Sequence, residues 1–262
     1  MRRVLTIAVT VWRELLRRKE IYVLLIMLAA MLYALLSVNI FGLGTTARYI
    51  MDLGLLMAWL FTIVLTVTVI CRQLPDEEKR GTIYPLLAKP LTRAELLLGK
   101  WLGAWSVVSC ASAVFYLLIA VVVRAYGGSF EWRTLAQGWV VHLSGLAALA
   151  AMGIAFSTRM TYGAAASMSY VVIASSFCML PRIPEMLVGV RGARATVLSA
   201  VYYLFPHFEL FDMRLRIVHE WGMVPWTSFA ILLSYGAVLT ALLLFISWLG
   251  YRRKHFQRGA AL

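Results

Sequence analysis

Six long apolar runs constrain this 262-residue chain more than any other feature of its sequence. A helix needs about 20 residues, at a rise of about 1.5 Å each, to cross the hydrocarbon core of a bilayer. Backbone amides cannot remain unpaired in lipid, and continuous runs without strict alternation indicate helices rather than barrel strands. With 62% hydrophobic and 14% charged residues, the composition excludes an ordinary soluble domain. We therefore predict an all-α, polytopic membrane protein with six transmembrane helices, at residues 21–41, 50–71, 101–123, 135–157, 162–181 and 226–250.

The distribution of positive charge predicts the orientation of these helices. An even number of spans places both termini on one side, and that side carries 17 of the 25 Lys and Arg residues. The positive-inside rule then makes both termini cytoplasmic. We expect the membrane to be a bacterial cytoplasmic (inner) membrane. The net charge of +13 is explained in this way, which argues against nucleic acid as a partner.

Residues 1–20 are expected to form a separate amphipathic helix on the cytoplasmic side, ahead of a transmembrane domain at residues 21–262. Apolar side chains recur at helical spacing, while five arginines take the other side. Such a helix is expected to lie on the inner leaflet with its arginines at anionic lipid headgroups, and it could also dock a cytoplasmic partner. The apolar positions are Val4, Leu5, Ala8, Val11, Trp12, Leu15 and Leu16.

Residues 72–100 form the one long, densely charged connector on the cytoplasmic side, which we name the elbow. Pro75 is expected to end the second span, and residues 76–80 are expected to be fully solvated. The sequence Thr92-Arg-Ala-Glu95 has the pattern of a capping box, which would begin the helix of the third span. Gly99 and Gly103, spaced as Gly-x-x-x-Gly, predict close approach of another helix.

Residues 182–225 are expected outside the cell, as short helices lying in or dipping into the outer leaflet. The segment mixes charges with too many apolar residues for a solvated loop. It also holds a group of residues that could bind a metal, although their irregular spacing favours a solvated polar face. These residues are His207, Glu209, Asp212, His219 and Glu220.

Few other positions indicate chemistry. Gly99-Lys100 is followed by Trp101 and lacks the upstream glycine of a phosphate-binding loop, so the chain is expected to bind no nucleotide. Cys71, Cys110 and Cys178 show no metal-binding or disulfide spacing and are expected to be buried apolar side chains. His142 lies within the fourth span, where it could serve transport or, more simply, hydrogen-bond between helices.

The elbow resembles the signature of permease subunits of ABC transporters of the type-2 exporter class. The resemblance extends to the layout of amphipathic helix, six spans and outer dipping segment, and it is greatest for short six-span permeases whose ATPase is a separate protein. Examples are the permeases of the nitrous-oxide-reductase maturation and gliding systems. The matching residues, in order, are Glu77, Glu78, Lys79, Arg80, Gly81 and Thr82, then Leu86, Leu87 and Pro90, then Thr92 and Arg93, and then Gly99-Lys100.

The resemblance implies a mechanical role without catalysis by this chain. The elbow would form a coupling helix seated in a cleft of a nucleotide-binding subunit, with charged contacts and apolar side chains both contributing. The implied partners are two ABC ATPase subunits, a second permease copy or paralogue, and membrane lipids. ATP and Mg would be bound by the ATPase subunits, and the chain itself would hold no cofactor.

Two other classes remain open from the sequence. A membrane-embedded lipid-modifying enzyme would need polar groups converging at one leaflet, for which residues 182–220 are the candidates. A passive channel or secondary transporter usually carries intramembrane charges and broken helices, which these spans almost lack. The sequence does not identify a substrate.

Overall fold

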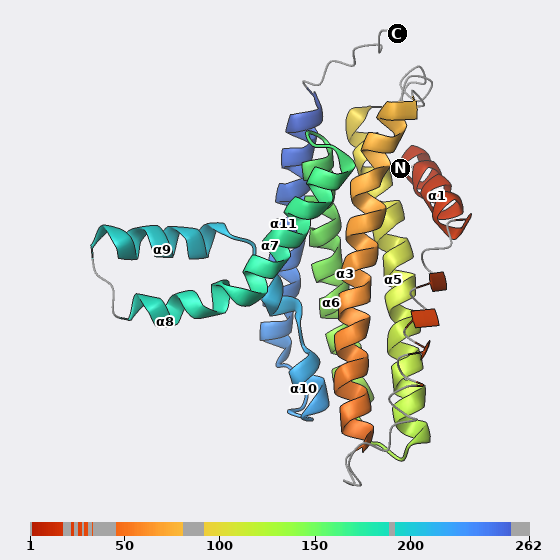
Figure 1. Ribbon diagram of the computed structural model, residues 1–262, viewed down its shortest axis with the longest axis vertical. Helices are drawn as coiled ribbons and strands as arrows, with labels where there is room; N and C mark the ends of the chain where they lie inside the picture. The colour runs from red at the N-terminus through yellow and green to blue at the C-terminus, as the bar shows by residue number, and fades with distance from the viewer. Residues whose placement is uncertain are drawn as a thin grey trace.

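The computed structural model describes residues 2–17, 22–23, 26–27, 29–30, 33, 46–80, 92–188 and 192–252. Throughout these residues the chain is helical, with short turns and connections and no strand (Figure 1). Five segments are long and apolar enough to cross a membrane. These findings confirm an all-α polytopic membrane protein. The first predicted span, residues 21–41, falls largely outside the described residues.

Four long helices and one shorter helix form an upright bundle. They are α3 (Thr46–Arg80), α5 (Arg93–Ala125), α6 (Trp132–Ser157), α7 (Tyr162–Cys178) and α11 (Trp226–Arg252). The fourth candidate span begins with α7 and continues through the short helices η1 (Leu180–Arg182) and α8 (Ile183–Leu187).

Helix α6 lies at the centre of the bundle. The most apolar window of α6 is 72% buried, whereas that of α11 is 11% buried, so α11 presents most of its surface outward. Small residues allow this central position, because side chains of neighbouring helices come within contact distance of the α6 backbone. A Cβ atom added at Gly145, for example, would lie 2.8 Å from Cβ of Phe211.

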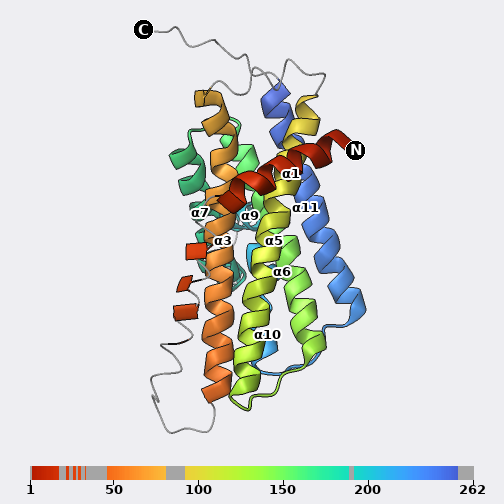
Figure 2. The same ribbon diagram turned by 90° about the vertical axis from the view of Figure 1, so that its right-hand side faces the viewer.

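One end of the bundle carries α1 (Arg2–Arg17), the last turn of α3, the start of α5 and the last turn of α11. We call this the elbow end, because the elbow connects α3 to α5 here (Figures 1 and 2). The start of α3 and the end of α5 lie at the opposite end, where residues 126–131 join α5 to α6.

Pro75 does not end the second span, contrary to the expectation from sequence. Helix α3 continues without a break to Arg80, with Pro75 inside it. Proline in a helix interior costs about 3 kcal/mol or more, because it removes a hydrogen bond and crowds the preceding turn. Packing compensates here: Leu74 is fully buried, and the next turn is tied to α5. Residues 76–78 are accordingly half-buried rather than fully solvated.

Helix α1 turns its apolar face toward protein. It crosses α5 near the elbow end (Figure 2), and Ala8, Val11 and Leu15 are buried. Leu5 and Val9 remain exposed. The sequence correctly indicated an amphipathic helix, but the main contact of its apolar stripe in the described structure is α5.

The segment between α7 and α11 divides into two parts. Helices α8 and α9 (Ala193–Leu204) form a hairpin that leaves the bundle sideways, about halfway along its length, and we call this hairpin the lateral arm (Figure 1). The 3-10 helix η2 (Phe208–Phe211) and α10 (Arg214–Val218) return to the bundle. Phe208, Phe211, Ile217 and Val218 are buried against it.

The three cysteines differ in environment. Cys71 is buried, as expected, and its thiol lies 3.7 Å from the hydroxyl oxygen of Ser169. Cys110 and Cys178 are exposed, so the expectation of burial was wrong for both. Periodicity places a residue in a helix, but the direction in which it faces depends on which helices become neighbours.

Candidate functional site

The two helical flanks of the elbow lie side by side at the elbow end. Helix α3 brings Glu77, Glu78 and Lys79 to this end, and α5 begins with Arg93. The remaining matched positions of the connector lie outside the described residues, namely Gly81, Thr82, Leu86, Leu87 and Pro90.

A buried ion pair joins the two flanks. Nζ of Lys100 on α5 lies 2.6 Å from Oε1 of Glu77 on α3, and the Lys100 side chain is only 3% exposed. A charge that is almost excluded from water requires such a partner. At least one carboxylate oxygen of Glu77 is therefore engaged by Lys100 of the same chain. The sequence suggested instead that Glu77 would contact a soluble partner.

A capping box begins α5, as the sequence predicted. The backbone N–H and the hydroxyl of Thr92 both donate to Oε2 of Glu95, at 2.8 and 2.9 Å. In return, the backbone N–H of Glu95 donates to the Thr92 hydroxyl at 3.2 Å. These bonds satisfy backbone donors that a helix otherwise leaves unpaired, and they fix the direction in which the elbow enters α5.

Arg93 joins the start of α5 to the end of α11. Its Nη1 donates to the carbonyl oxygens of Tyr251 at 2.6 Å and Arg252 at 2.9 Å. A cation at a helix C-terminus is favourable, because the last carbonyls are unpaired and carry partial negative charge. The guanidinium also lies 5.9 Å from the ring centroid of Tyr251, which is fully buried.

Gly99 and Gly103 form the surface on which α1 lies. A Cβ atom at Gly99 would lie 2.7 Å from Cβ of Ile7, and one at Gly103 would lie 2.8 Å from Cβ of Val11. Beside this contact, Nε1 of Trp12 donates to the hydroxyl of Ser106 at 2.7 Å. Helix α1 is therefore attached to the same helix that begins at the elbow.

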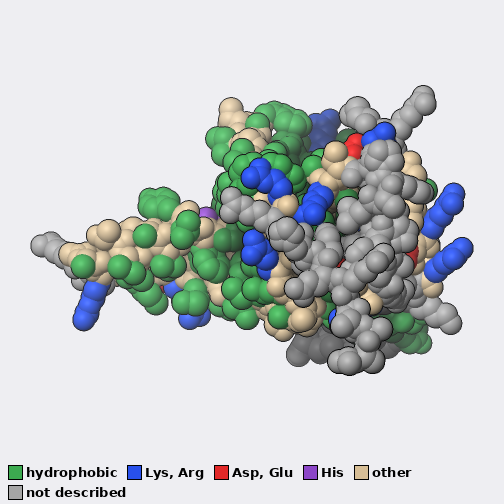
Figure 3. Space-filling view, turned by 90° about the horizontal axis from the view of Figure 1, so that it is seen from above, with side chains coloured by type: hydrophobic (Ala, Val, Ile, Leu, Met, Phe, Trp, Pro, Cys, Tyr) green, Lys and Arg blue, Asp and Glu red, His purple; other side chains and the backbone are tan. Residues whose placement is uncertain are grey.

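Positively charged side chains are visible around the elbow end (Figure 3). Lys79 is exposed, Glu78 is half-buried, and the side chain of Arg80 lies outside the described set. Of residues 77–79, whose side chains the structure describes, Lys79 is thus the one that is exposed.

His142 is buried in the middle of the bundle. Its Nε2 lies 2.9 Å from the hydroxyl oxygen of Thr62 on α3, and its ring is flanked by Trp59 and Tyr116. It borders a small, mainly apolar cavity between α3, α6, α7 and η2. The contact with Thr62 is the interhelical hydrogen bond that the simpler interpretation of His142 required.

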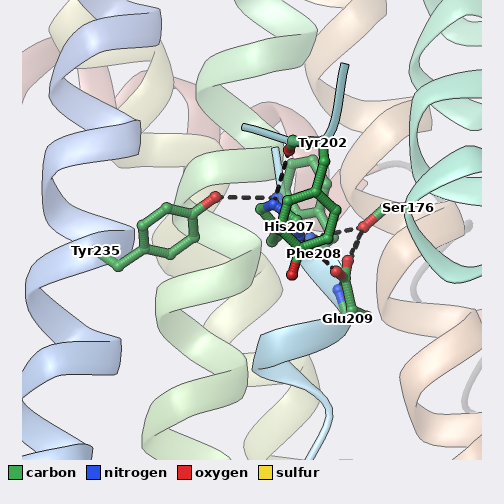
Figure 4. A network of polar contacts seen from close by, with 6 residues as sticks. All are labelled: Ser176, Tyr202, His207, Phe208, Glu209 and Tyr235. Carbon is green, nitrogen blue, oxygen red and sulfur yellow. Dashed lines mark hydrogen bonds and ion pairs between the residues drawn. The ribbon is translucent and has the colours of Figure 1, made fainter. Parts of the chain in front are cut away.

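A second polar network lies at the base of the lateral arm (Figure 4). The hydroxyl of Ser176 on α7 accepts from the backbone N–H groups of Phe208 at 2.7 Å and Glu209 at 3.3 Å, and it donates to the Glu209 carboxylate. The hydroxyl of Tyr235 on α11 accepts from the backbone N–H of His207 at 2.9 Å. The segment that follows the arm is thus fixed to two spans.

Both ring nitrogens of His207 are engaged in this network. Nδ1 lies 2.6 Å from Oε1 of Glu209, and Nε2 lies 2.9 Å from the carbonyl oxygen of Tyr202. Because a carbonyl oxygen only accepts, Nε2 must carry a proton. Nδ1 faces the Glu209 carboxylate, so both ring nitrogens of His207 have polar partners.

The other polar residues of the segment 182–225 include two that have partners outside the His207 network. Asp212 pairs with Arg214 at 2.9 Å, and Glu220 accepts weakly from Ser129 at 3.4 Å. Among the described residues, no three His, Cys, Asp or Glu side chains are grouped to hold a metal. Both ring nitrogens of His207 are engaged by Glu209 and Tyr202, so neither is placed to act as a general base in this arrangement.

Several residues that shape these sites were assigned no role from the sequence. Lys100 was noted only as part of a motif, and Ser176, Tyr202 and Tyr235 were not singled out. The one available signal was Lys100 itself, a lysine in an otherwise apolar stretch, since buried lysine requires a partner. Serine and tyrosine within apolar spans carry no comparable signal.

Comparison with known proteins fits this architecture. A family described as "ABC-2 family transporter protein" matches residues 60–252, which include the end of α3, all of α5, α6, α7 and α11, and the lateral arm. No curated protein matches the sequence. The permease domain of this family lacks an ATPase domain. The chain therefore belongs to the ABC-2 family of transporter proteins, as an integral membrane permease component.

Proposed function

We propose that this chain is the permease subunit of an ATP-driven exporter and couples ATP hydrolysis by a separate nucleotide-binding subunit to movement of substrate across, or out of, the membrane. It would operate with two ATPase subunits and a second permease copy or paralogue. ATP and Mg would bind to the ATPase subunits. The elbow end would face the cytoplasm of a bacterial cell, which the concentration of positive charge at that end supports.

The observation that carries this proposal is the linkage of both elbow flanks to the bundle. Glu77 and Lys100 join α3 to α5, the Thr92–Glu95 box fixes the entry into α5, and Arg93 joins α5 to α11. A force applied to the connector would therefore move three spans together. Loosely attached flanks would instead absorb the displacement before it reached the substrate path.

Helix α1 extends the same unit. Because it lies on Gly99 and Gly103, a displacement of the start of α5 would carry α1 with it. The exposed side of α1 carries Arg3, Arg13 and Arg17, which suit anionic lipid headgroups. In this proposal α1 supports α5 at the membrane surface while the elbow moves.

The test separates attachment of the ATPase from transmission of force. The permease is co-expressed with its candidate ATPase, purified through a tag on the permease, and assayed for bound ATPase and for ATP hydrolysis. Lys79→Glu reverses an exposed charge and should reduce the amount of ATPase recovered. Lys100→Met breaks the buried pair with Glu77 and should leave recovery of the ATPase largely intact while lowering the ATP hydrolysis that the permease stimulates.

Arg48→Glu, at the opposite end of the bundle, is the matched charge-reversal control and should preserve recovery. The proposal fails if the permease reaches the membrane without an ATP-binding protein attached and Lys79→Glu changes nothing. It also fails if the elbow is accessible to impermeant labels only from outside the cell.

A further inference from the structure

The lateral arm projects from the bundle and packs against little else in the chain. Helix α9 has no buried residue, and among the other helices it makes its main contacts with α8 (Figures 1 and 3). We propose that the arm docks onto a second copy of this chain. This inference rests on the proposed function, which requires two permease halves, and it adds the surface that joins them.

The depth of the arm is set by its base. Phe211, seven residues after the end of α9, packs against Gly145 near the middle of α6. Its ring also lies 5.9 Å from that of Tyr235 in α11. The arm consequently leaves the bundle about halfway along the spans, within the depth of the hydrocarbon core rather than at its surface.

Lipid alone is a poor environment for the arm at this depth. The arm exposes Glu185 and Arg194, and Arg182 directly before it is exposed as well; charged side chains inside a bilayer normally face protein or water. Its turn includes Gly192 with a φ of 73°, and this residue provides no side-chain cap for α9. Irregular backbone at membrane depth is tolerated only where it is buried in protein or lines an aqueous cavity.

The arm also lacks the pattern of a helix lying at a membrane surface. Such helices carry several basic residues on a distinct polar face, whereas α9 contains only Arg194. The half-buried residues Ala195, Leu198, Ser199 and Tyr202 form the side toward α8. The opposite side carries Val197, Val201 and Leu204, which are exposed and apolar. These apolar positions could face lipid or protein, so it is the charged side chains and the irregular turn at this depth that call for protein around the arm.

A second permease copy meets these requirements. Rotation about a two-fold axis along the membrane normal keeps both arms at the same depth, so each arm can lie against the spans of the other copy. The 5 residues of α8 and the 12 of α9 approach the size of one side of a standard interface, about 20–30 residues. The exposed face of α7 beside the arm, which includes Val171 and Cys178, would be continuous with this interface.

The base of the arm is held to the bundle by a polar network, so the arm is a fixed element rather than a loose loop. Ser176, His207, Glu209 and Tyr235 form the network at its base, and Tyr202 of α9 contributes its carbonyl oxygen and packs its ring against His207 at 4.6 Å (Figure 4). An arm held in this way presents the same surface to a partner each time the two copies meet.

The experiment places a photo-crosslinking amino acid at Val197, Val201 or Leu204 in the full-length chain, co-expressed with its candidate ATPase. Illumination in intact membranes of cells carrying two differently tagged permease copies reports what covers each position. The expected result is a shift of the chain to the mass of two permeases, with both tags in the shifted band. The matched control is Leu198, on the side of α9 toward α8, where cross-links should remain within one chain.

Adducts to lipid at all three outer positions, or to a protein other than the permease, would overturn the inference. Bound ATPase is measured in the same samples, which separates this failure from failure of the proposed function. Lipid adducts with ATPase still bound would contradict the proposed docking surface but would leave the exporter proposal intact. Two-permease adducts without any bound ATPase would support the docking surface and contradict the exporter proposal.

Discussion

Lys100 and Glu77 lie 2.6 Å apart, on different spans, at the point where those spans leave the elbow. The lysine is almost fully buried, while the glutamate keeps about a quarter of its side-chain exposure. Removing one partner of a buried pair is more costly than removing both, because the remaining charge stays desolvated. This relationship yields the first of four predictions.

Glu77→Gln should destabilise the protein, whereas the double variant Glu77→Gln with Lys100→Met should recover much of the loss. Breaking a fully buried pair costs about 3–5 kcal/mol, and we expect roughly half of this here, since Glu77 retains contact with solvent. Thermal unfolding in detergent measures the effect as a double-mutant cycle. Lys79→Gln, an exposed neighbour, should change little, and additive effects of the two substitutions would contradict the pairing.

Gly99→Leu should detach α1 from α5. Even a Cβ atom at this position would lie 2.7 Å from the side chain of Ile7, so α1 must shift, at a cost of about 1–3 kcal/mol for overpacking. Trypsin should then cleave faster after Arg13 or Arg17, which are exposed on α1. Gly163→Leu is the control, because no atom lies within 4 Å of its added Cβ atom. Unchanged cleavage in Gly99→Leu would contradict the contact.

Arg93→Ala should loosen the last turn of α11. The guanidinium accounts for hydrogen bonds to the carbonyl oxygens of Tyr251 and Arg252, and a cation at a helix C-terminus contributes about 0.3–1 kcal/mol. Hydrogen exchange should become faster there by a few-fold and remain unchanged at the start of α11. Arg93→Lys should give a smaller effect, because lysine keeps the charge but lacks the planar fork. Equal exchange in all three proteins would exclude the link.

Ser176→Ala should destabilise the base of the lateral arm. The substitution removes the acceptor for two backbone N–H groups and a donor to Glu209, and each unsatisfied buried group costs about 1–3 kcal/mol. The adjacent Ser175 donates only to the carbonyl of Val171 in its own helix, so Ser175→Ala is the matched control. Thermal unfolding of the two variants should differ clearly, and equal midpoints would show that the network contributes nothing to stability.

The class of the protein could be predicted from sequence because hydropathy acts locally. Five apolar runs became helices long enough to span a membrane, and Thr92 with Glu95 formed the capping box that their spacing predicted. Both depend on residues within a few helical turns of one another. The family resemblance was likewise carried by motif positions between Glu77 and Lys100, and the family match covers residues 60–252.

Other expectations were wrong because tertiary contacts opposed local preference. Pro75 should have ended a helix, yet α3 continues to Arg80 where burial of Leu74 and the Glu77–Lys100 pair compensate. The apolar stripe of α1 was expected to face lipid, and α5 covers much of it instead. Lipid and protein are equally acceptable neighbours for an apolar side chain, so hydropathy does not distinguish them.

The sequence by itself determined that this chain is a helical membrane protein with a charged elbow, because span length and backbone hydrogen bonding in lipid leave no other solution. Only the tertiary structure decided that Lys100 meets Glu77, that Arg93 reaches α11 and that Ser176 holds the base of the arm. These contacts join residues 23, 158 and 32 positions apart, and helical periodicity carries no information over such separations.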